Sequence, residues 1–204
     1  MSSNHFDLVV VGGGPAGYAA AVAASSSSLS VGLVERDLLG GTCLHRGCIP
    51  AKELLETATV HRTVLHAGEF GVITSAPTLD FSATQNRKRA VIDRLFKGVN
   101  QLLQNKEVKV FSGTGRLETG RTVTVQHSDG TEQTLTAESV LLAAGSVPRT
   151  IPGFEIDGEI VLTSNEVLDL QALPESAAIV GGGAIGCEFA SMLADLGSEI
   201  TILE

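Results

Sequence analysis

The sequence contains the glycine-rich pattern GxGxxG twice, and this repetition narrows the choice of fold more than any other feature. The first copy contributes three glycines and a proline: Gly12, Gly14, Pro15 and Gly17. It follows a short apolar run and opens a stretch of small residues, which predicts a strand, a turn and a helix. In such a turn the first glycine permits the tight bend, the second lets backbone amides approach a pyrophosphate, and the third lets helix and strand pack closely. Glu35 ends the next apolar run, where its carboxylate can accept hydrogen bonds from a ribose.

The second copy has the same surroundings in the sequence. Its residues are Gly181, Gly183, Ile185 and Gly186, and Glu204 ends the apolar run that follows. The last glycine and the acidic residue are equally far apart in both copies, since 35 − 17 = 204 − 186 = 18. One copy alone is weak evidence, because glycine-rich turns also occur without a ligand, but two copies at matched spacing predict two dinucleotide sites. A carboxylate at Glu204 favours a ribose 2′-hydroxyl over a 2′-phosphate, and therefore NAD over NADP.

The order of the predicted elements places the chain in the α/β class, with a βαβ unit of parallel sheet around each turn. Residues 1–147 are predicted to form a Rossmann-like dinucleotide-binding domain with a helical excursion at about 50–105 and a small antiparallel sheet. Its later strands are expected at residues 108–111, 115–118, 123–127, 133–136 and 140–144. Residues 148–204 are predicted to be the start of a second Rossmann-like domain. Two strands and one helix cannot close a core, so we expect the intact protein to continue beyond Glu204.

Composition excludes several classes of protein. Hydrophobic residues make up 43% and charged residues 18%, which suits a chain with a buried core rather than a disordered one. The net charge of −9, without a basic stripe, argues against nucleic acid as a partner. Residues 8–24 are apolar enough to suggest a membrane span, but the glycines and proline inside this run predict a turn instead. The first residues lack the basic segment of a secretory signal, so we expect a cytoplasmic protein.

Two of the three cysteines, Cys43 and Cys48, lie five residues apart in a segment that is predicted to begin a helix. In a regular helix their Cα atoms would be ~8.6 Å apart, whereas a disulfide needs about 7 Å or less. A bond between them therefore requires an irregular first turn, which Gly47 makes easier. Inert thiols are one alternative, and a zinc site is another, but zinc needs about four ligands and only His45 is nearby, so no metal is expected. We expect His45 to face solvent and Cys187 to be a small buried side chain on a packed helix.

The cysteine segment resembles that of a known family. GGTCLHRGCIPAK, at residues 40–52, is similar to the GGxCxxxGCIPxK segment of class I FAD-dependent pyridine nucleotide–disulfide oxidoreductases. The resemblance extends to both glycine-rich turns and to VLLAAGSVP at residues 140–148, and so covers nearly the whole chain. Members that oxidise dihydrolipoamide with NAD look closest. The resemblance implies FAD in the first turn, NAD in the second, and electron transfer from dihydrolipoamide through the Cys43–Cys48 disulfide and FAD to NAD.

The resemblance also implies roles for individual residues. Cys48 would face the flavin, and Cys43 would exchange with the dithiol substrate. Lys52 would lie beside the flavin and pair with Glu188, and Gly115 would contact the adenine part of FAD. Further cofactor contacts are implied at Gly41, Thr42, Ala144 and Gly145.

The same resemblance implies partners that the residues alone do not. A full-length member is a homodimer, and its partner is the lipoyl-bearing acyltransferase of a 2-oxoacid dehydrogenase complex. The family's general base is a His–Glu pair that belongs to a later part of such a chain. Two alternatives remain open: a mycothione, glutathione or mercuric reductase, or a non-catalytic flavin-binding fragment.

Overall fold

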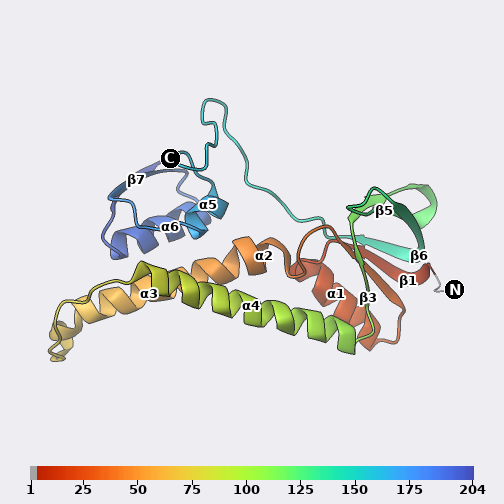
Figure 1. The fold of residues 1–204 in the computed structure, drawn as a ribbon, viewed down its shortest axis with the longest axis horizontal. Coiled ribbons are helices and arrows are strands. Elements are labelled where there is room, and N and C mark those ends of the chain that lie inside the picture. Colours follow the sequence, from red (N-terminus) through yellow and green to blue (C-terminus); the bar gives the residue numbers. More distant parts are fainter. Residues whose placement is uncertain (1–3) are drawn as a thin grey trace. The chain divides into compact units, whose positions relative to one another are not determined.

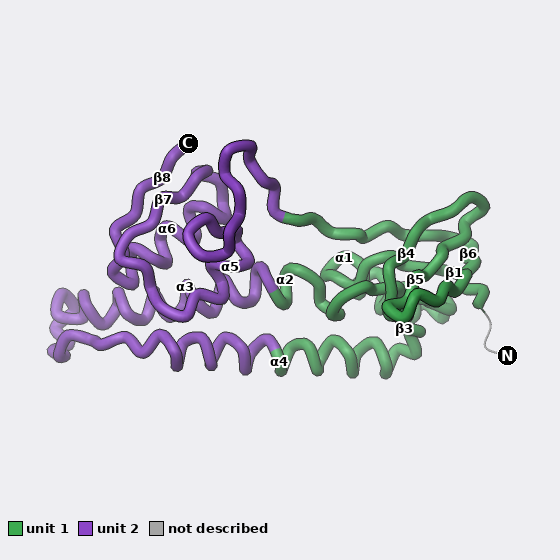
Figure 2. Tube along the Cα trace, turned by 45° about the horizontal axis from the view of Figure 1, so that its top comes forward, with its two compact units in different colours: residues 1–45, 93–147 green, residues 46–92, 148–204 purple. Residues whose placement is uncertain are grey.

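The computed structural model describes residues 4–204 and divides the chain into two compact units. Figure 1 shows the elements in chain order, and Figure 2 shows the division. Unit 1 consists of residues 1–45 and 93–147, and unit 2 of residues 46–92 and 148–204. Each unit is thus assembled from two separate stretches of the sequence. One boundary falls within α4 (Phe81–Asn105), as the change of colour along this helix shows in Figure 2.

Unit 1 is built on a six-stranded sheet with the order β3-β2-β1-β6-β5-β4. The strands are β1 (His5–Val11), β2 (Val31–Glu35), β3 (Lys109–Ser112), β4 (Thr114–Leu117), β5 (Thr122–Gln126) and β6 (Glu132–Leu142). The first three pair in parallel, as the α/β class requires. The prediction of separate strands at 133–136 and 140–144 was wrong, because β6 is continuous. Its first part pairs antiparallel with β5 and its second part pairs parallel with β1, and Thr136 takes part in both ladders.

Both faces of β1 are buried, which explains its unbroken apolar sequence. Val10 faces a helical layer, where it joins a core with Ala21 of α1 (Pro15–Ser26) and Leu103 of α4. Val9 and Val11 face the opposite way, into a core that includes residues of β5 and β6. Residues of β5 and of the first part of β6 therefore pack on one face of the parallel strands, and helices cover the other face.

The cysteine segment forms two helices rather than one. α2 (Gly41–Arg46) ends and α3 (Cys48–Leu65) begins on either side of Gly47, whose backbone angles of φ −151° and ψ −116° are not helical. The expected irregularity between the two cysteines is confirmed. Whether the sulfurs are bonded stays a prediction.

Unit 2 packs helices around a two-stranded parallel sheet. Besides α3 and part of α4 it contains η1 (Ala67–Phe70), α5 (Ser164–Leu168), β7 (Ser176–Val180), α6 (Ala184–Asp195) and β8 (Glu199–Leu203). Its core joins Leu54 of α3, Leu168 of α5 and Met192 of α6. The expected elements did not include α5, although Thr163 and Glu166 form a capping box at its start and so mark it in the sequence. Within residues 4–204, no helix is both long enough and apolar enough to cross a membrane.

Candidate functional site

The first glycine-rich turn joins β1 to α1 so tightly that side chains are excluded. Gly12 has a φ of +107°, a left-handed conformation that favours glycine, and a Cβ there would lie 2.1 Å from the carbonyl oxygen of Ala143. A Cβ on Gly17 would lie 1.7 Å from the carbonyl oxygen of Gly12. Both distances are far below van der Waals contact, and both partners are backbone atoms that cannot turn away. Gly17 is therefore required by the turn itself, and Gly12 is required both by its left-handed conformation and by the neighbouring segment at Ala143.

The start of α1 is open to an anion. Gly14 is the N-cap and provides no side-chain hydrogen bond to the first turn of the helix, and Pro15 follows at the first helical position. Such a helix start leaves backbone N–H groups for an anionic ligand, which the helix dipole also favours. Gly41, with φ +58°, approaches from the loop before α2, and a Cβ on it would lie 2.7 Å from the Cα of Gly14. Thr42 follows it and is exposed. The backbone geometry thus fits the pyrophosphate of a dinucleotide.

Glu35 is fixed beside this turn by backbone amides. Its Oε2 accepts a hydrogen bond from the N–H of Gly13 (2.6 Å), and its Oε1 accepts one from the N–H of Asp37 (2.8 Å). A cavity of about 390 Å³ opens next to it. The residues that line this cavity are Glu35, Asp37, Leu38, Leu39, Phe96, Asn100, Leu103, Gln104, Val108, Val110 and Ser112. Six apolar residues line it together with polar groups that include the carboxylates of Glu35 and Asp37, and this mixture suits the base and ribose of an adenosine.

The other residues expected near FAD in unit 1 also lie around the turn. Ala144 follows the carbonyl that Gly12 approaches, and Gly145 has a φ of +74°. Gly115 on β4 is packed against two strands of the sheet, because a Cβ there would lie 2.9 Å from Val11 Cγ1 and 3.1 Å from Val34 Cγ1. Close packing is enough to explain this glycine, so its contact with FAD stays a prediction.

The second turn repeats the backbone of the first inside unit 2. Gly181 has a φ of +108°, and a Cβ on Gly186 would lie 2.1 Å from the carbonyl oxygen of Gly181. Gly183 is the N-cap of α6 and, like Gly14, gives no side-chain hydrogen bond. The carboxylate of Glu204 accepts a hydrogen bond from the N–H of Gly182. The neighbouring Ile185 is exposed.

The prediction that Cys187 is buried was wrong. Its side chain is exposed, and its Sγ donates a weak hydrogen bond to the carbonyl oxygen of Gly182 at 3.0 Å. The residue belongs to the first turn of α6, whose buried side begins further along with Phe189 and Ala190. Only the three-dimensional position of the helix decides which of its faces is covered.

The two cysteines of the cysteine segment differ in exposure. Cys43 lies on α2 and is half-buried, and Cys48 is the exposed first residue of α3. The prediction that His45 faces solvent was wrong. Its ring packs edge-on against Phe96 with ring centres 5.3 Å apart, and its Nε2 is 2.9 Å from the carbonyl oxygen of Leu39. An imidazole can satisfy both an apolar and a polar neighbour, which residue type alone did not reveal.

Lys52 and Glu188 form an ion pair within unit 2, where Lys52 Nζ donates to Glu188 Oε1. Lys52 lies on α3 and Glu188 on α6, and their side chains are 59% and 41% exposed. Ion pairs with this exposure contribute only about 0–1 kcal/mol to stability. Stability alone therefore gives little reason for the pair.

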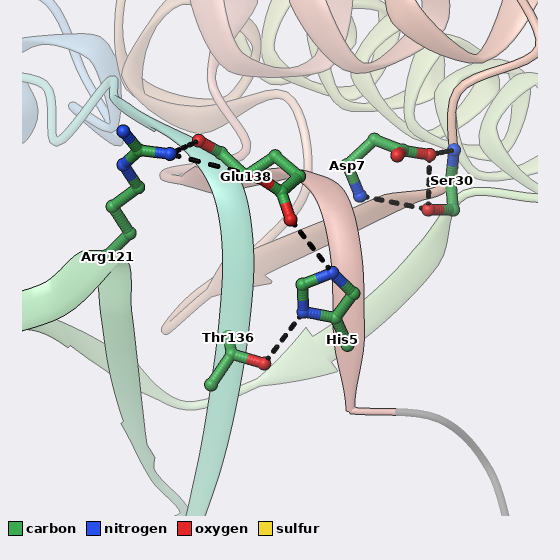
Figure 3. A network of polar contacts seen from close by, with 6 residues as sticks. All are labelled: His5, Asp7, Ser30, Arg121, Thr136 and Glu138. Carbon is green, nitrogen blue, oxygen red and sulfur yellow. Dashed lines mark hydrogen bonds and ion pairs between the residues drawn. The ribbon is translucent and has the colours of Figure 1, made fainter.

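Sequence reasoning missed a polar network at the amino ends of the strands, away from the turn (Figure 3). His5 contacts Thr136 Oγ1 (3.0 Å) and Glu138 Oε1 (3.3 Å). Nearby, Asp7 Oδ2 accepts hydrogen bonds from both the N–H and the hydroxyl of Ser30, and these bonds hold the pKa of Asp7 below its usual value. Single polar residues at strand ends have no sequence pattern, so only the structure identifies the network.

Comparison with known proteins agrees with this geometry. The family model described as pyridine nucleotide-disulphide oxidoreductase matches residues 6–204. The chain is 45% identical to a dihydrolipoyl dehydrogenase of Bacillus subtilis and 43% identical to one of Chlamydia pneumoniae, in both cases over 99% of its length. The crystal structure of LpdA from Mycobacterium tuberculosis matches 96% of the chain with a TM-score of 0.87 and 28% identity. The chain spans 44%, 43% and 44% of the lengths of these three proteins.

Proposed function

The chain belongs to the pyridine nucleotide-disulphide oxidoreductase family, and on this basis we propose that it is part of a dihydrolipoyl dehydrogenase. The intact enzyme would transfer electrons from a dihydrolipoyl dithiol to NAD. The observation that carries the proposal is the pair of matching glycine-rich turns, one in each unit, with the cysteine segment between them in the sequence. The names of the relatives support the choice of substrate.

Proteins of this family use FAD and NAD(H). The FAD-binding residues that we propose all lie in unit 1 except Lys52: Gly12, Gly14, Pro15, Gly17, Glu35, Gly41, Thr42, Lys52, Gly115, Ala144 and Gly145. The NAD-binding residues that we propose surround the second turn: Gly181, Gly183, Ile185, Gly186 and Glu204. Glu188 is proposed as a cofactor-binding residue through its pair with Lys52. This assignment goes with a division at residue 147 into an FAD-binding domain and the first part of an NAD-binding domain.

The cysteines would carry the exchange with substrate. A thiolate of the substrate attacks the Cys43 sulfur of the Cys43–Cys48 disulfide, and Cys48 leaves as thiolate. The second substrate thiol then displaces Cys43, so the product leaves as a cyclic disulfide and both cysteines are reduced. Bound FAD would supply the two-electron relay between the reduced cysteines and NAD. The non-helical Gly47 supports this role, because it removes the constraint that a regular helix would place on the pair.

The ion pair of Lys52 and Glu188 would serve the flavin rather than the fold. An ammonium group is the natural partner for negative charge on a reduced flavin, and Glu188 would hold that group in one orientation. The half-exposed state of both side chains supports the idea that they face a ligand.

Partners and location are also proposals. We propose that the intact protein is a homodimer and that it serves a 2-oxoacid dehydrogenase complex through its lipoyl-bearing acyltransferase. A cysteine pair that is reduced and reoxidised in each turnover suits the reducing cytoplasm, which supports a cytoplasmic location.

The proposal is tested by anaerobic reduction of the native-length protein with dihydrolipoamide, followed by addition of NAD. We expect the flavin absorbance to bleach and then to recover as NADH forms. Cys43→Ser or Cys48→Ser should lower NADH formation by about 10³-fold or more, because each removes one sulfur of the exchange. Cys187→Ser is the matched control and should retain activity, since a hydroxyl can keep the bond to Gly182.

Other outcomes would favour the alternatives. Oxidation of NADPH with a glutathione-type or mycothiol-type disulfide, or with Hg²⁺, would support a reductase instead. A protein that binds FAD but is not bleached by any dithiol would support a non-catalytic flavin-binding module.

A further inference from the structure

Lys88 on α4 is almost completely buried, with 2% of its side chain exposed. Lysine is rarely buried to this extent unless its charge is paired. Its Nζ donates to the carbonyl oxygen of Leu168 and, at 2.8 Å, to Oδ1 of Asp169, whose side chain is 75% exposed. The buried ammonium group therefore points at the chain just where α5 ends.

Gln85 supports the same contact from one turn earlier on α4. Its Nε2 donates to the carbonyl oxygens of Leu168 (3.3 Å) and Leu170 (3.0 Å). Positions three residues apart share a helix face, so Gln85 and Lys88 act side by side. The last carbonyls of any helix lack donors within that helix. Two side chains of α4 thus donate hydrogen bonds to the carbonyl oxygens at the end of α5.

The end of α5 is in turn packed against the helices that carry the ion pair. Leu168 is 2% exposed and belongs to the same core as Phe189 of α6 and Leu54 of α3. Phe189 directly follows Glu188, and Leu54 lies two residues after Lys52. A displacement of Leu168 would therefore alter the packing next to both members of the pair.

We propose that Lys88, assisted by Gln85, is a positioning residue for the Lys52–Glu188 pair. By fixing the end of α5 it holds α6 against α3, and so keeps Glu188 within reach of Lys52. The role of the pair at the flavin rests on the proposed function above. The effect of Lys88 on the packing of α5, α6 and α3 depends only on contacts within unit 2.

The effect of Lys88 on this packing is tested by hydrogen exchange of the native-length protein without added cofactor. Lys88→Met keeps the length of the side chain and removes its charge. We expect amides of α5 and α6 to exchange about tenfold faster, because a buried charged hydrogen bond is lost. Arg89→Met is the matched control: it removes a positive charge from the next position of α4, where Arg89 is exposed and donates a hydrogen bond to Asn86 of the same helix. Unchanged exchange in α6 would overturn the proposal.

A milder variant covers the case in which Lys88→Met does not fold. Gln85→Leu removes two donors without placing an apolar group on the charged site, and we expect about threefold faster exchange in α5 and α6. The same exchange as in the unaltered protein would again overturn the proposal.

The positioning role is tested by a double-mutant cycle on the midpoint potential of bound flavin. Glu188→Gln should shift this potential, and the shift should fall by about half or more when Lys88→Met is also present, because coupled residues are not additive. Additive shifts would overturn the positioning role, since a merely structural residue would leave the effect of Glu188 intact. If the native-length protein bound no flavin, the proposed function would fail, while the exchange experiment would still decide the role of Lys88.

Discussion

The two glycine-rich turns share their backbone geometry but not their surroundings. Gly12 and Gly181 have φ values of +107° and +108°, and in both turns a carboxylate accepts a hydrogen bond from the N–H of the next glycine. A Cβ on Gly12 would collide with Ala143, whereas a Cβ on Gly181 would have no atom within 4 Å. The first turn is enclosed by a neighbouring strand end, and the second is open on that side.

This difference separates two reasons for a glycine. One reason is local: the turn needs a residue in the left-handed conformation, and its helix starts in close contact with the preceding strand. The other reason is tertiary: in some sheets a neighbouring strand ends close to the turn and leaves no room for a Cβ. In unit 1 the end of β6 lies beside β1, while among the described residues of unit 2 the sheet consists of β7 and β8 alone.

The largest effect that the two turns share is expected at the two glycines that the local geometry makes equivalent. Gly17→Ala and Gly186→Ala each place a methyl group about 2 Å from a backbone oxygen within the same turn. We expect each to lower the free energy of unfolding by about 3 kcal/mol or more, measured by denaturant titration. Gly17→Ala should also reduce FAD content, and Gly186→Ala should reduce NADH binding.

Gly98→Ala is the control for that pair. Gly98 lies inside α4, and a Cβ there would have no atom within 4 Å. Alanine suits a helix better than glycine, so the free energy of unfolding should rise by up to about 1 kcal/mol. A loss at Gly98 as large as at Gly17 would contradict the steric explanation.

A smaller effect should distinguish the two turns. Gly12→Ala and Gly181→Ala share the same backbone strain of about 1–3 kcal/mol, but only the first adds a collision with Ala143. We therefore expect Gly12→Ala to cost at least about 1 kcal/mol more than Gly181→Ala in the same titration. Equal losses of unfolding free energy in the two variants would mean that the segment at Ala143 can move away from the added methyl group.

The smallest effect concerns pH and the amino ends of the strands. In unit 1 the residue before β2, Ser30, donates its N–H to the charged carboxylate of Asp7. In unit 2 the residue before β8, Ser198, donates its hydroxyl to an uncharged group, the carbonyl oxygen of Pro174 (2.7 Å). Hydrogen bonds from Ser30, first from its side chain and then from its backbone, lower the pKa of Asp7 below its ordinary value of 3.8. Since the folded pKa is depressed, this stabilisation is present above pH 3.8 and is lost as the pH falls through the folded pKa.

Hydrogen exchange of the Ser30 amide between about pH 5 and about pH 2 measures this effect. Protection of Ser30 should decrease at the acid end, and in Asp7→Asn it should be weak at every pH. The amide of Ser198 should show no matching change. If protection of the Ser30 amide decreased at acid pH in Asp7→Asn as well, the pH effect would belong to another titratable group.

Much of the fold could be predicted because it depends on local chemistry. The glycines of both turns, the acidic residues at the strand ends and the break at Gly47 each follow from the geometry that one short segment can adopt. The continuous β6 could not be predicted in the same way, since Ala137 and Glu138 contain no feature that marks a passage from one ladder to another. The capping box of Thr163 and Glu166 marks the start of α5 in the sequence, but a helix of five residues is too short to show a helical period.

The sequence by itself determined the two glycine-rich turns, the cysteine segment and the α/β class, because each rests on residue types whose backbone requirements hold in any surroundings. Only the tertiary structure decided that His45 is half-buried, that Cys187 is exposed and that Lys88 reaches the end of α5. These outcomes depend on which distant segment covers a given helix face. That choice is made by packing between parts of the chain about 80 residues apart, as for Lys88 and Leu168, and no local pattern encodes it.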